Sequence, residues 1–331
     1  MQRKKTKVAL IFGGRSAEHQ VSLVSASAIY KNLDRSRYQV ISLYITKEGR
    51  WKRVASPLLP LGKLASGPSF SFLPWEIGGL PEKLHADIYF PVLHGPYGED
   101  GTIQGLLEMA DVPYVGAGVL ASAAGMDKEV MKTLFAAAGI PVVKHRPVFD
   151  TDWRKNRKLI LSVLEKEFML PFFVKPANLG SSVGISKVNA RAGTARALQK
   201  AFRYDRKVLV EAGIQGREIE CSVLGNDAPR ASVPGEIIPF RDFYDYRDKY
   251  LEGKTKLRIP APLPESTTRE VQRLAVAAYK AVGCSGMARI DFFLEDKTGR
   301  VYVNEINTIP GFTEISMYPK LWEASGTPFP R

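Results

Sequence analysis

Cysteine is nearly absent from this sequence. Its 331 residues contain only two, Cys221 and Cys284, too few for the disulfide framework of a small secreted protein. We predict that both are small buried side chains in a reducing compartment, so we expect a cytoplasmic protein. Long apolar runs are also missing, since none approaches the roughly 18 residues of a membrane span. The N-terminus has a basic start and then an apolar run of only about six residues, which predicts a first strand and not a signal peptide.

Signs of nucleic-acid binding are absent as well. The sequence has 47 Lys and Arg residues against 34 Asp and Glu residues, a net charge of +13, and a basic protein can bind nucleic acid, anionic membranes or anionic small molecules. The basic residues are spread along the whole chain, without a basic run interleaved with aromatic residues, a helix-turn-helix signal or zinc-ligand spacing. We therefore predict a basic surface around a site for a phosphate ligand, and no nucleic-acid or membrane partner.

The first part of the chain alternates short apolar runs with helical patterns. We predict strands at 7–12, 38–46, 86–95 and 112–118, and helices at 21–33 and 102–110. Such alternation is typical of α/β proteins with a mostly parallel sheet. The stretch 56–79, rich in Pro, Gly and Ser, is expected to be a surface excursion.

The rest of the chain has a different character. A helix predicted at 122–139 leads to strands at 170–176, 183–188, 207–213 and 217–225 with glycine-rich breaks, which favours a small antiparallel sheet. The polar and aromatic stretch 240–264 follows, and it is a candidate lid because structureless connections of this length are uncommon and often functional. An amphipathic helix at 267–283 and a hairpin at 288–307 complete the pattern.

The last hairpin holds the most informative cluster. Its turn is centred near Thr298, so Asp291 should lie opposite Glu305, and Arg289 opposite Asn307. Because side chains alternate between the faces of a strand, these four would share one face. Two carboxylates and an amide oxygen suit Mg²⁺ bridging substrate phosphates, and an arginine beside them could neutralise an oxyanion. A solvated polar face is the alternative, and a one-residue slip in register would scatter the cluster.

Two further segments could handle a nucleotide. The turn Lys175–Gly184 (KPANLGSSVG) combines a lysine with glycines whose flanking amides can cradle phosphate oxygens. It is not a Walker loop, since it lacks both the G-K-[ST] order and a following helix, and a plain hairpin turn is the alternative. Glu211 and Glu218 flank the link between two predicted strands; they could hold ribose hydroxyls or simply be exposed.

Two residues follow predicted parallel strands of the first sheet, where such folds bind ligands. Glu18, in the turn FGGRSAEH, could capture an ammonium group or be an ordinary acid in the first turn of a helix. His94 ends a strand before GPYGEDG; a lone histidine is usually structural, but this position improves its prospects as a ligand contact. The turn lacks the G-x-G-x-x-G fingerprint of dinucleotide-binding folds.

Seven segments together resemble one family. FGGRSAEHQVS, HGPYGEDGTIQGLLE, GMDK, FVKPANLGSSVG, DYRDKY, RIDFF and NEINTIPGFT occur in the order found in the D-alanine–D-alanine ligases of the ATP-grasp superfamily. The resemblance runs from about Val8 to Pro330. It implies a three-domain ATP-grasp fold: an N-terminal parallel α/β (Rossmann-like) substrate domain at 1–122, a central subdomain at 123–213 and a C-terminal catalytic domain at 214–331, with a lid loop at about 240–262.

The resemblance also implies roles for the matching residues. The implied ATP-binding residues are Lys128, Lys175, Ser181, Ser182, Glu211, Ala212, Ile214, Glu218, Lys249, Asn304 and Glu305. The implied ligands of two Mg²⁺ ions are Asp291, Glu305 and Asn307. The implied D-alanine contacts are Glu18, His94, Ser316 and Met317, and the implied catalytic residues are Glu18, Ser181, Tyr250, Arg289, Gly311 and Ser316. In this scheme Arg289 and the Gly311 amide form the oxyanion site.

The implied activity is the ATP-dependent joining of two D-alanines through a D-alanyl phosphate, for peptidoglycan precursor synthesis. Mn²⁺ would substitute for Mg²⁺, a monovalent cation could take part, and the family implies a homodimer. The nearest rival is an ATP-grasp ligase that makes D-alanyl-D-lactate or D-alanyl-D-serine, against which Glu18 and Tyr250 argue. A regulatory relative without activity gains no support, since no expected catalytic residue is missing, and a nucleic-acid-binding protein is the rival from another class.

Two features depart from the family pattern. The family usually continues past a segment like GTPFP into a closing helix, whereas this sequence stops at Arg331. The net charge of +13 also exceeds what the resemblance implies.

Overall fold

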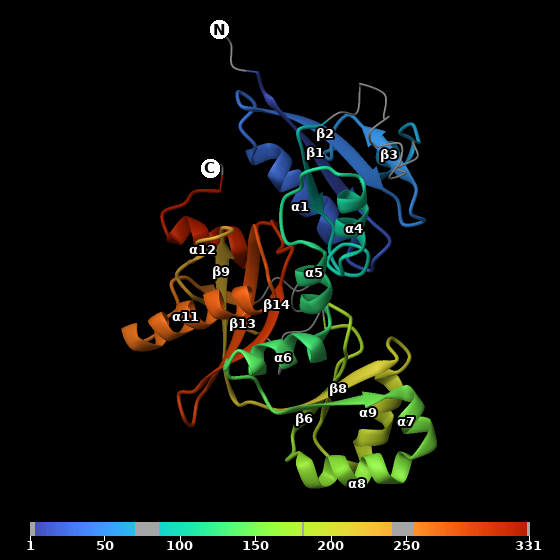
Figure 1. The fold of residues 1–331 in the computed structure, drawn as a ribbon, viewed down its shortest axis with the longest axis vertical. Coiled ribbons are helices and arrows are strands. Elements are labelled where there is room, and N and C mark those ends of the chain that lie inside the picture. Colours follow the sequence, from blue (N-terminus) through green and yellow to red (C-terminus); the bar gives the residue numbers. More distant parts are fainter. Residues whose placement is uncertain (1–3, 70–85, 181, 240–254, 330–331) are drawn as a thin grey trace.

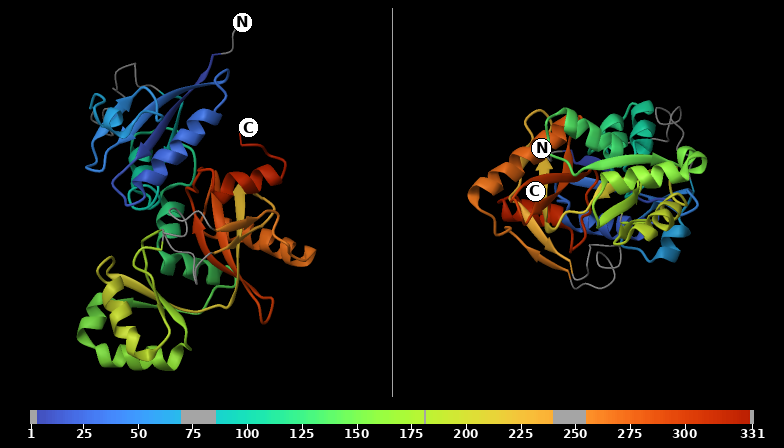
Figure 2. Two further views of the ribbon diagram at one scale, coloured as in Figure 1. Left: turned by 180° about the vertical axis from the view of Figure 1, so that it is seen from behind. Right: turned by 90° about the horizontal axis from the view of Figure 1, so that it is seen from below.

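The computed structural model describes residues 4–69, 86–180, 182–239 and 255–329. Three β-sheets divide these residues into three units (Figure 1). The N-terminal unit (blue) lies at one end of the long axis and the central unit (green to yellow) at the other, while the C-terminal unit (orange to red) lies beside the region where they meet. Figure 2 shows the same arrangement from behind and from below.

The N-terminal unit is the predicted α/β layer. Its sheet has the order β3 (Trp51–Val54), β2 (Tyr38–Ile45), β1 (Thr6–Gly13) and β4 (Ile88–Val92), with β1 parallel to both β2 and β4. The middle of β1 is fully buried, as expected for a parallel strand covered on both faces. Helices α1 (His19–Asn32) and α4 (Thr102–Met109) confirm the two predicted helices.

One local prediction in this unit was wrong. The predicted strand 112–118 is reduced to a single bridge between Tyr114 and Tyr89. The described part of the predicted surface excursion 56–79 is mostly exposed, and it contains the short helix α2 (Leu61–Ala65). Leu64 of this helix is almost fully buried in a core cluster with residues of the N-terminal sheet, so it anchors the segment to that sheet. Residues 70–79 lie outside the described residues.

The helix predicted at 122–139 is two helices, α5 (Val119–Met126) and α6 (Lys128–Ala137). Asp127 separates them because its backbone is extended, with φ −85° and ψ 104°. Its carboxylate accepts hydrogen bonds from the Glu129 and Val130 amides, both at 3.1 Å, which is the geometry of a helix N-cap. The residue that ends one helix therefore starts the next.

The central unit has an antiparallel sheet of order β5 (His145–Phe149), β8 (Lys207–Ala212), β6 (Phe172–Pro176) and β7 (Ser186–Val188). Its helices are α7 (Asp150–Lys155), α8 (Arg157–Glu167) and α9 (Thr194–Ala201), with the short 3₁₀ turn η2 (Arg191–Gly193). The antiparallel prediction is confirmed for three of its four strands. The fourth, 217–225, does not join this sheet.

That fourth segment is β9 (Gly216–Leu224), in the middle of the C-terminal sheet. The order is β12 (Lys256–Arg258), β11 (Gly235–Ile238), β9, β13 (Met287–Glu295) and β14 (Val301–Asn307), with β10 (Arg230–Ala231) also paired to β9. Strand β12 falls in the stretch 240–264 that composition predicted to be a loop. It forms because its backbone pairs with β11.

Helix α11 (Glu265–Ala281) packs on the C-terminal sheet, and α12 (Met317–Ala324) follows the hairpin. Cys221 and Cys284 are buried and carry free thiols, as predicted. Among the described residues, no helix is both long and apolar enough to cross a membrane.

Candidate active site

The β13–β14 hairpin forms the floor of the candidate site. Asp291 pairs with Glu305 and Arg289 with Asn307, which confirms the predicted register. Nearer the turn, Phe292 pairs with Val303, so Asn304 is the extra residue of a β-bulge. The bulge turns two consecutive side chains, Asn304 and Glu305, away from the buried face, and a bulge of this kind re-aims side chains next to active sites.

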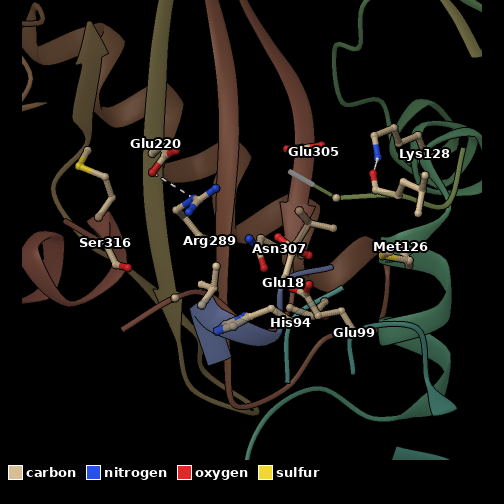
Figure 3. Close-up of a pocket in the computed structure, with 18 of the residues that line it drawn as sticks. Glu18, His94, Glu99, Met126, Lys128, Glu220, Arg289, Glu305, Asn307 and Ser316 are labelled. Carbon is tan, nitrogen blue, oxygen red and sulfur yellow. Dashed lines mark hydrogen bonds and ion pairs between the residues drawn. The ribbon is translucent and has the colours of Figure 1, made fainter. Parts of the chain in front are cut away.

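Arg289 lies between two carboxylates on this floor. Its Nε and Nη2 each donate to Asp291 at 2.7 Å, and its Nε lies 3.0 Å from Glu220 Oε2 on β9 (Figure 3). Burial alone would lower the pKa of the guanidinium, but Asp291 and Glu220 outweigh it and raise that pKa above its usual value. Arg289 is thus a fixed cation whose plane is set by two anions. Sequence reasoning missed Glu220, which alternation along β9 places on the same face as Glu218.

Asn307 is held by a residue of the N-terminal unit. Its side-chain nitrogen faces Glu99 Oε1 at 2.6 Å and Ile309 O at 3.2 Å, the amide orientation that satisfies both acceptors. Glu99 also accepts from the Gly95 amide at 2.6 Å. Burial and the nearby charge of Glu18 raise the pKa of Glu99. Sequence reasoning missed Glu99, although the HGPYGEDG segment contains it.

The predicted metal ligands fit a hard cation in their chemistry. Asp291 and Glu305 are a cross-strand carboxylate pair, and the orientation of the Asn307 amide leaves its oxygen available to the site. Carboxylate and amide oxygens are the donors that Mg²⁺ takes beside substrate phosphates. Across the described ranges, no group of three or more His, Cys, Asp or Glu side chains is placed to hold a metal ion. A cation here would therefore need the amide or substrate oxygens as well.

His94 joins the N-terminal unit to the loop after β14. Its Nδ1 lies 3.0 Å from Ile309 O and its Nε2 lies 3.2 Å from Ser25 Oγ. Because a carbonyl only accepts, Nδ1 carries the proton and Nε2 accepts from the serine. Burial lowers the pKa of His94 to about 4, so the ring is neutral near pH 7. The Ser25 hydroxyl in turn accepts from the Phe312 amide at 3.1 Å.

The loop that precedes α12 is closely folded around Ser316. Ser316 Oγ accepts from the Thr313 amide at 2.9 Å and contacts Thr313 Oγ1 at 2.8 Å. A Cβ added to Gly311 would lie 2.8 Å from Ser316 Oγ, so a larger residue here would displace the Ser316 hydroxyl. Ser316 is the N-cap of α12 and Met317 is its first residue. Both line the same pocket as Arg289 and Gly311.

Glu18 approaches two glycines, Gly95 of its own unit and Gly180 of the central unit. A Cβ on Gly95 would lie 2.6 Å from Glu18 Oε2, and one on Gly180 would lie 3.1 Å from it. The glycine-rich turn of the central unit therefore reaches the N-terminal turn of the chain. Three predicted residues, Ser181, Lys249 and Tyr250, lie outside the described residues.

Lysines dominate the side of the site that the central unit supplies. Lys175 on β6 forms an ion pair with Glu211 on β8, and Lys128 at the start of α6 donates to Leu179 O at 2.6 Å. Glu211 is buried, and burial alone would raise the pKa of its carboxyl group. The positive charges of Lys132 and Lys175 outweigh this effect and lower the pKa to about 2. Lys132 was not identified from the sequence.

Two adjoining pockets collect the predicted residues that the structure describes. The first is lined by Glu18, His94, Lys128, Arg289, Glu305, Asn307, Gly311, Ser316 and Met317. The second is lined by Lys128, Lys175, Ser182, Glu211, Ala212, Ile214, Glu218, Asp291, Asn304 and Glu305. The residues implied to bind D-alanine fall in the first pocket, and those implied to bind adenosine fall in the second. Lys128 and Glu305 line both pockets, so they stand where the two meet. Figure 3 shows these two side chains with other residues that line the first pocket.

This architecture defines a class of enzyme. A sheet with lysines and a glycine-rich turn faces a second sheet with acidic residues across one pocket, and a parallel α/β unit adds an adjoining pocket: this is an ATP-grasp ligase fold. The sequence profile described as D-ala D-ala ligase N-terminus matches residues 7–117, and the one described as D-ala D-ala ligase C-terminus matches residues 134–331. The chain belongs to the D-alanine–D-alanine ligase family.

Individual relatives agree with this assignment. The chain is 51% identical to D-alanine–D-alanine ligase of Solibacter usitatus, over 98% of this chain and 92% of the relative. The solved structure of D-alanine–D-alanine ligase from Coxiella burnetii superposes with a TM-score of 0.85 at 41% identity, covering 98% of this chain and 92% of that one. The VanG D-Ala:D-Ser ligase from Enterococcus faecalis gives a TM-score of 0.86 at 36% identity, covering 99% and 97%.

Proposed function

We propose that this chain joins two D-alanines to D-alanyl-D-alanine with ATP, through a D-alanyl phosphate, in peptidoglycan precursor synthesis. The observation that carries the proposal is the shared wall of the two pockets. Lys128 and Glu305 line both, so a carboxylate bound in the first pocket can meet the γ-phosphate of a nucleotide bound in the second. The family membership supports the same reaction. The proposal includes a cytoplasmic protein with three domains, at 1–122, 123–213 and 214–331.

The first step needs an anion to attack an anion. We assign Glu18 and the loop around His94 to the first D-alanine, whose ammonium group suits the Glu18 carboxylate. Lys128 and Lys175 place positive charge on the nucleotide side, which reduces the repulsion between carboxylate and phosphate. Asp291, Glu305 and Asn307 would hold two Mg²⁺ ions, for which Mn²⁺ would substitute. When bound, such ions supply charge neutralisation and orientation for phosphoryl transfer.

The second step forms the peptide bond. The amine of the second D-alanine attacks the acyl carbon, and a tetrahedral oxyanion forms and collapses to release phosphate. Arg289 is the fixed cation nearest this chemistry, and we assign it with the Gly311 amide to the oxyanion. Ser316 and the Met317 amide, at the start of α12, are assigned to the carboxylate of the second D-alanine, because a helix N-terminus favours anions. Ser181, Lys249 and Tyr250 complete the proposal as contacts of Glu18 and the γ-phosphate.

Phosphate release tests the proposal directly. The purified chain is given ATP and Mg²⁺ with D-alanine, L-alanine, D-serine or D-lactate, singly and in pairs, with and without K⁺, and the product is identified by mass. We expect release with D-alanine alone, with the dipeptide as product. Release that needs D-serine or D-lactate beside D-alanine would move the acceptor assignment. Absence of release with every acceptor, in a folded chain, would refute the proposal.

A further inference from the structure

Lys132 is a buried lysine that neither pocket uses. Its side chain is fully inaccessible to solvent. It lies on α6 one helical turn after Lys128, so the two share a face of the helix, but only Lys128 lines a pocket. Burial lowers the pKa of its ammonium group, and the charge of Glu211 opposes that effect. A charged lysine here must have partners, because burying an unpaired ion costs a large desolvation free energy.

The contacts of Lys132 connect three elements of the nucleotide side. Its Nζ lies 3.2 Å from Glu211 Oε1 on β8 and donates to Asn304 O on β14 at 2.8 Å. Asn304 is the extra residue of the bulge beside Glu305. Helix α6 lies beside β14 and extends towards the central sheet (Figure 1). One ammonium group therefore joins α6, the central sheet and the strand that carries the acidic residues.

The charges of Glu211, Lys132 and Lys175 determine how much positive charge reaches the nucleotide pocket. Glu211 carries one negative charge and contacts two lysines, Lys132 and Lys175. Lys175 is the one that lines the nucleotide pocket. Without Lys132, the Glu211 carboxylate would cancel the charge of Lys175; with Lys132 present, the three groups keep a net positive charge, and it stands at the pocket wall.

We infer that Lys132 is a positioning residue of the nucleotide site: it neutralises Glu211 so that Lys175 keeps its charge for the nucleotide phosphates, and it fixes the bulge that presents Asn304 and Glu305. The inference rests on the proposed function, since it requires a nucleotide in the second pocket. It predicts an effect that depends on the phosphates of the ligand and not on its base.

Two variants and two ligands test this. Lys132→Met leaves Glu211 paired with Lys175. The double variant Lys132→Met with Glu211→Gln removes the carboxylate as well, which leaves Lys175 as the one charge of the original three. Lys144→Met is the matched control, because it removes a positive charge from an exposed lysine of the same unit. The dissociation constants of ATP and adenosine are measured for each by calorimetry at fixed Mg²⁺, and circular dichroism checks the fold.

We expect Lys132→Met to weaken ATP about tenfold, as loss of one net charge near the phosphates should, and adenosine far less. The double variant should recover part of the ATP affinity, because Lys175 is again unopposed, and Lys144→Met should match the wild type. The inference is overturned if Lys132→Met binds ATP normally, if it weakens both ligands equally, or if the double variant binds ATP no better. A wild-type chain that binds neither ligand would instead refute the proposed function.

Discussion

At the scale of single residues, Arg289 is the side chain whose loss should cost most activity. We expect Arg289→Ala to lower kcat by about 10²–10³, the usual loss when one oxyanion donor is removed. The kcat of Arg289→Lys should lie between those of the wild type and Arg289→Ala, because lysine keeps the charge but cannot contact both Asp291 and Glu220 with one planar group. Turnover is measured as phosphate release at saturating substrates. Arg300→Ala, an exposed arginine of the same hairpin, is the control, and equal losses in the two alanine variants would contradict the assignment.

His94 should make stability depend on pH. Its pKa is about 4 in the folded chain, below the ordinary value of 6.5, because it is buried. The unfolded chain therefore binds a proton that the folded chain refuses, so stability is full above pH 6.5 and falls as pH drops towards 4. The loss is about 1.4 kcal/mol per pH unit within that window. The free energy of unfolding, measured with urea from pH 7 to pH 4.5, should fall less for His94→Asn than for the wild type. If the two chains lose the same free energy over this range, His94 is not the cause.

What the sequence could say about single residues depended on local spacing. Asp291, Glu305 and Arg289 were predicted from one hairpin, because cross-strand partners follow from counting outwards from a turn. Glu99 and Lys132 could not be found in this way. Their partners Asn307 and Asn304 lie in another unit of the fold, and a lysine within a helix is ordinarily expected on the solvent side.

At the scale of elements, the break between α5 and α6 sets where Lys128 stands. Asp127 caps α6 and forms an ion pair with Lys207 on β8 at 2.6 Å. We expect Asp127→Ala to destabilise the fold by about 1–2 kcal/mol, the range for a lost N-cap, and to raise the KM for ATP severalfold. Asp127→Asn keeps the cap and should cost less. Thermal unfolding and ATP titrations measure both, and equal losses in the two variants would assign the effect to the ion pair instead.

The register of the β13–β14 hairpin was predicted correctly at Asp291 and Glu305, although it depends on a bulge that the sequence does not indicate. Counting from Thr298 gives Asp291 opposite Glu305, which the structure confirms. Nearer the turn, the same count would pair Phe292 with Asn304, but Phe292 pairs with Val303. The extra residue of the bulge, Asn304, brings the pairing back to the counted register at Asp291 and Glu305. Nothing in the residue pattern indicates this bulge; the strand pairing shows it, and Lys132 donates a hydrogen bond to its carbonyl at Asn304. The wrong predictions have a similar origin, because β9 and β12 depend on partner strands distant in sequence.

At the scale of the molecule, the three units meet because side chains cross between them. His94 and Glu99 of the N-terminal unit contact the segment from Asn307 to Ile309, and Gly180 of the central unit approaches Glu18. Order along the sequence predicted the α/β layer, one antiparallel sheet after it and the last hairpin, but not that 217–225 joins that hairpin in a separate sheet. These crossings could not be predicted from periodicity, which reports only which face of an element is buried.

The net charge is also a property of the whole molecule. Basic residues occur along the whole chain, but their excess over acidic residues is uneven. Residues 141–215 hold 15 Lys and Arg against 6 Asp and Glu, a net +9 of the total +13. Lys155 and Lys158, at the end of α7 and the start of α8, are both exposed. Solvated charge of this kind attracts polyanions weakly and without sequence preference, with a dissociation constant of about 10⁻⁴–10⁻⁶ M at physiological salt. We therefore expect the chain to bind duplex DNA readily at low salt and only weakly at physiological salt.

Charge reversal separates this surface from a true nucleic-acid site. Lys155→Glu with Lys158→Glu should abolish the low-salt DNA binding and leave ATP turnover unchanged, since neither residue lines a pocket. Arg269→Glu with Arg273→Glu, exposed on α11, makes the same change in net charge on the C-terminal unit. DNA binding is followed by fluorescence anisotropy across a salt series. If the net charge of the whole chain determines DNA affinity, the two double variants should weaken DNA binding equally. If the surface of the central unit determines it, the Lys155 and Lys158 variant should weaken binding more. Tight binding that persists at 0.15 M salt, roughly the physiological ionic strength, would instead revive a nucleic-acid partner for this fold.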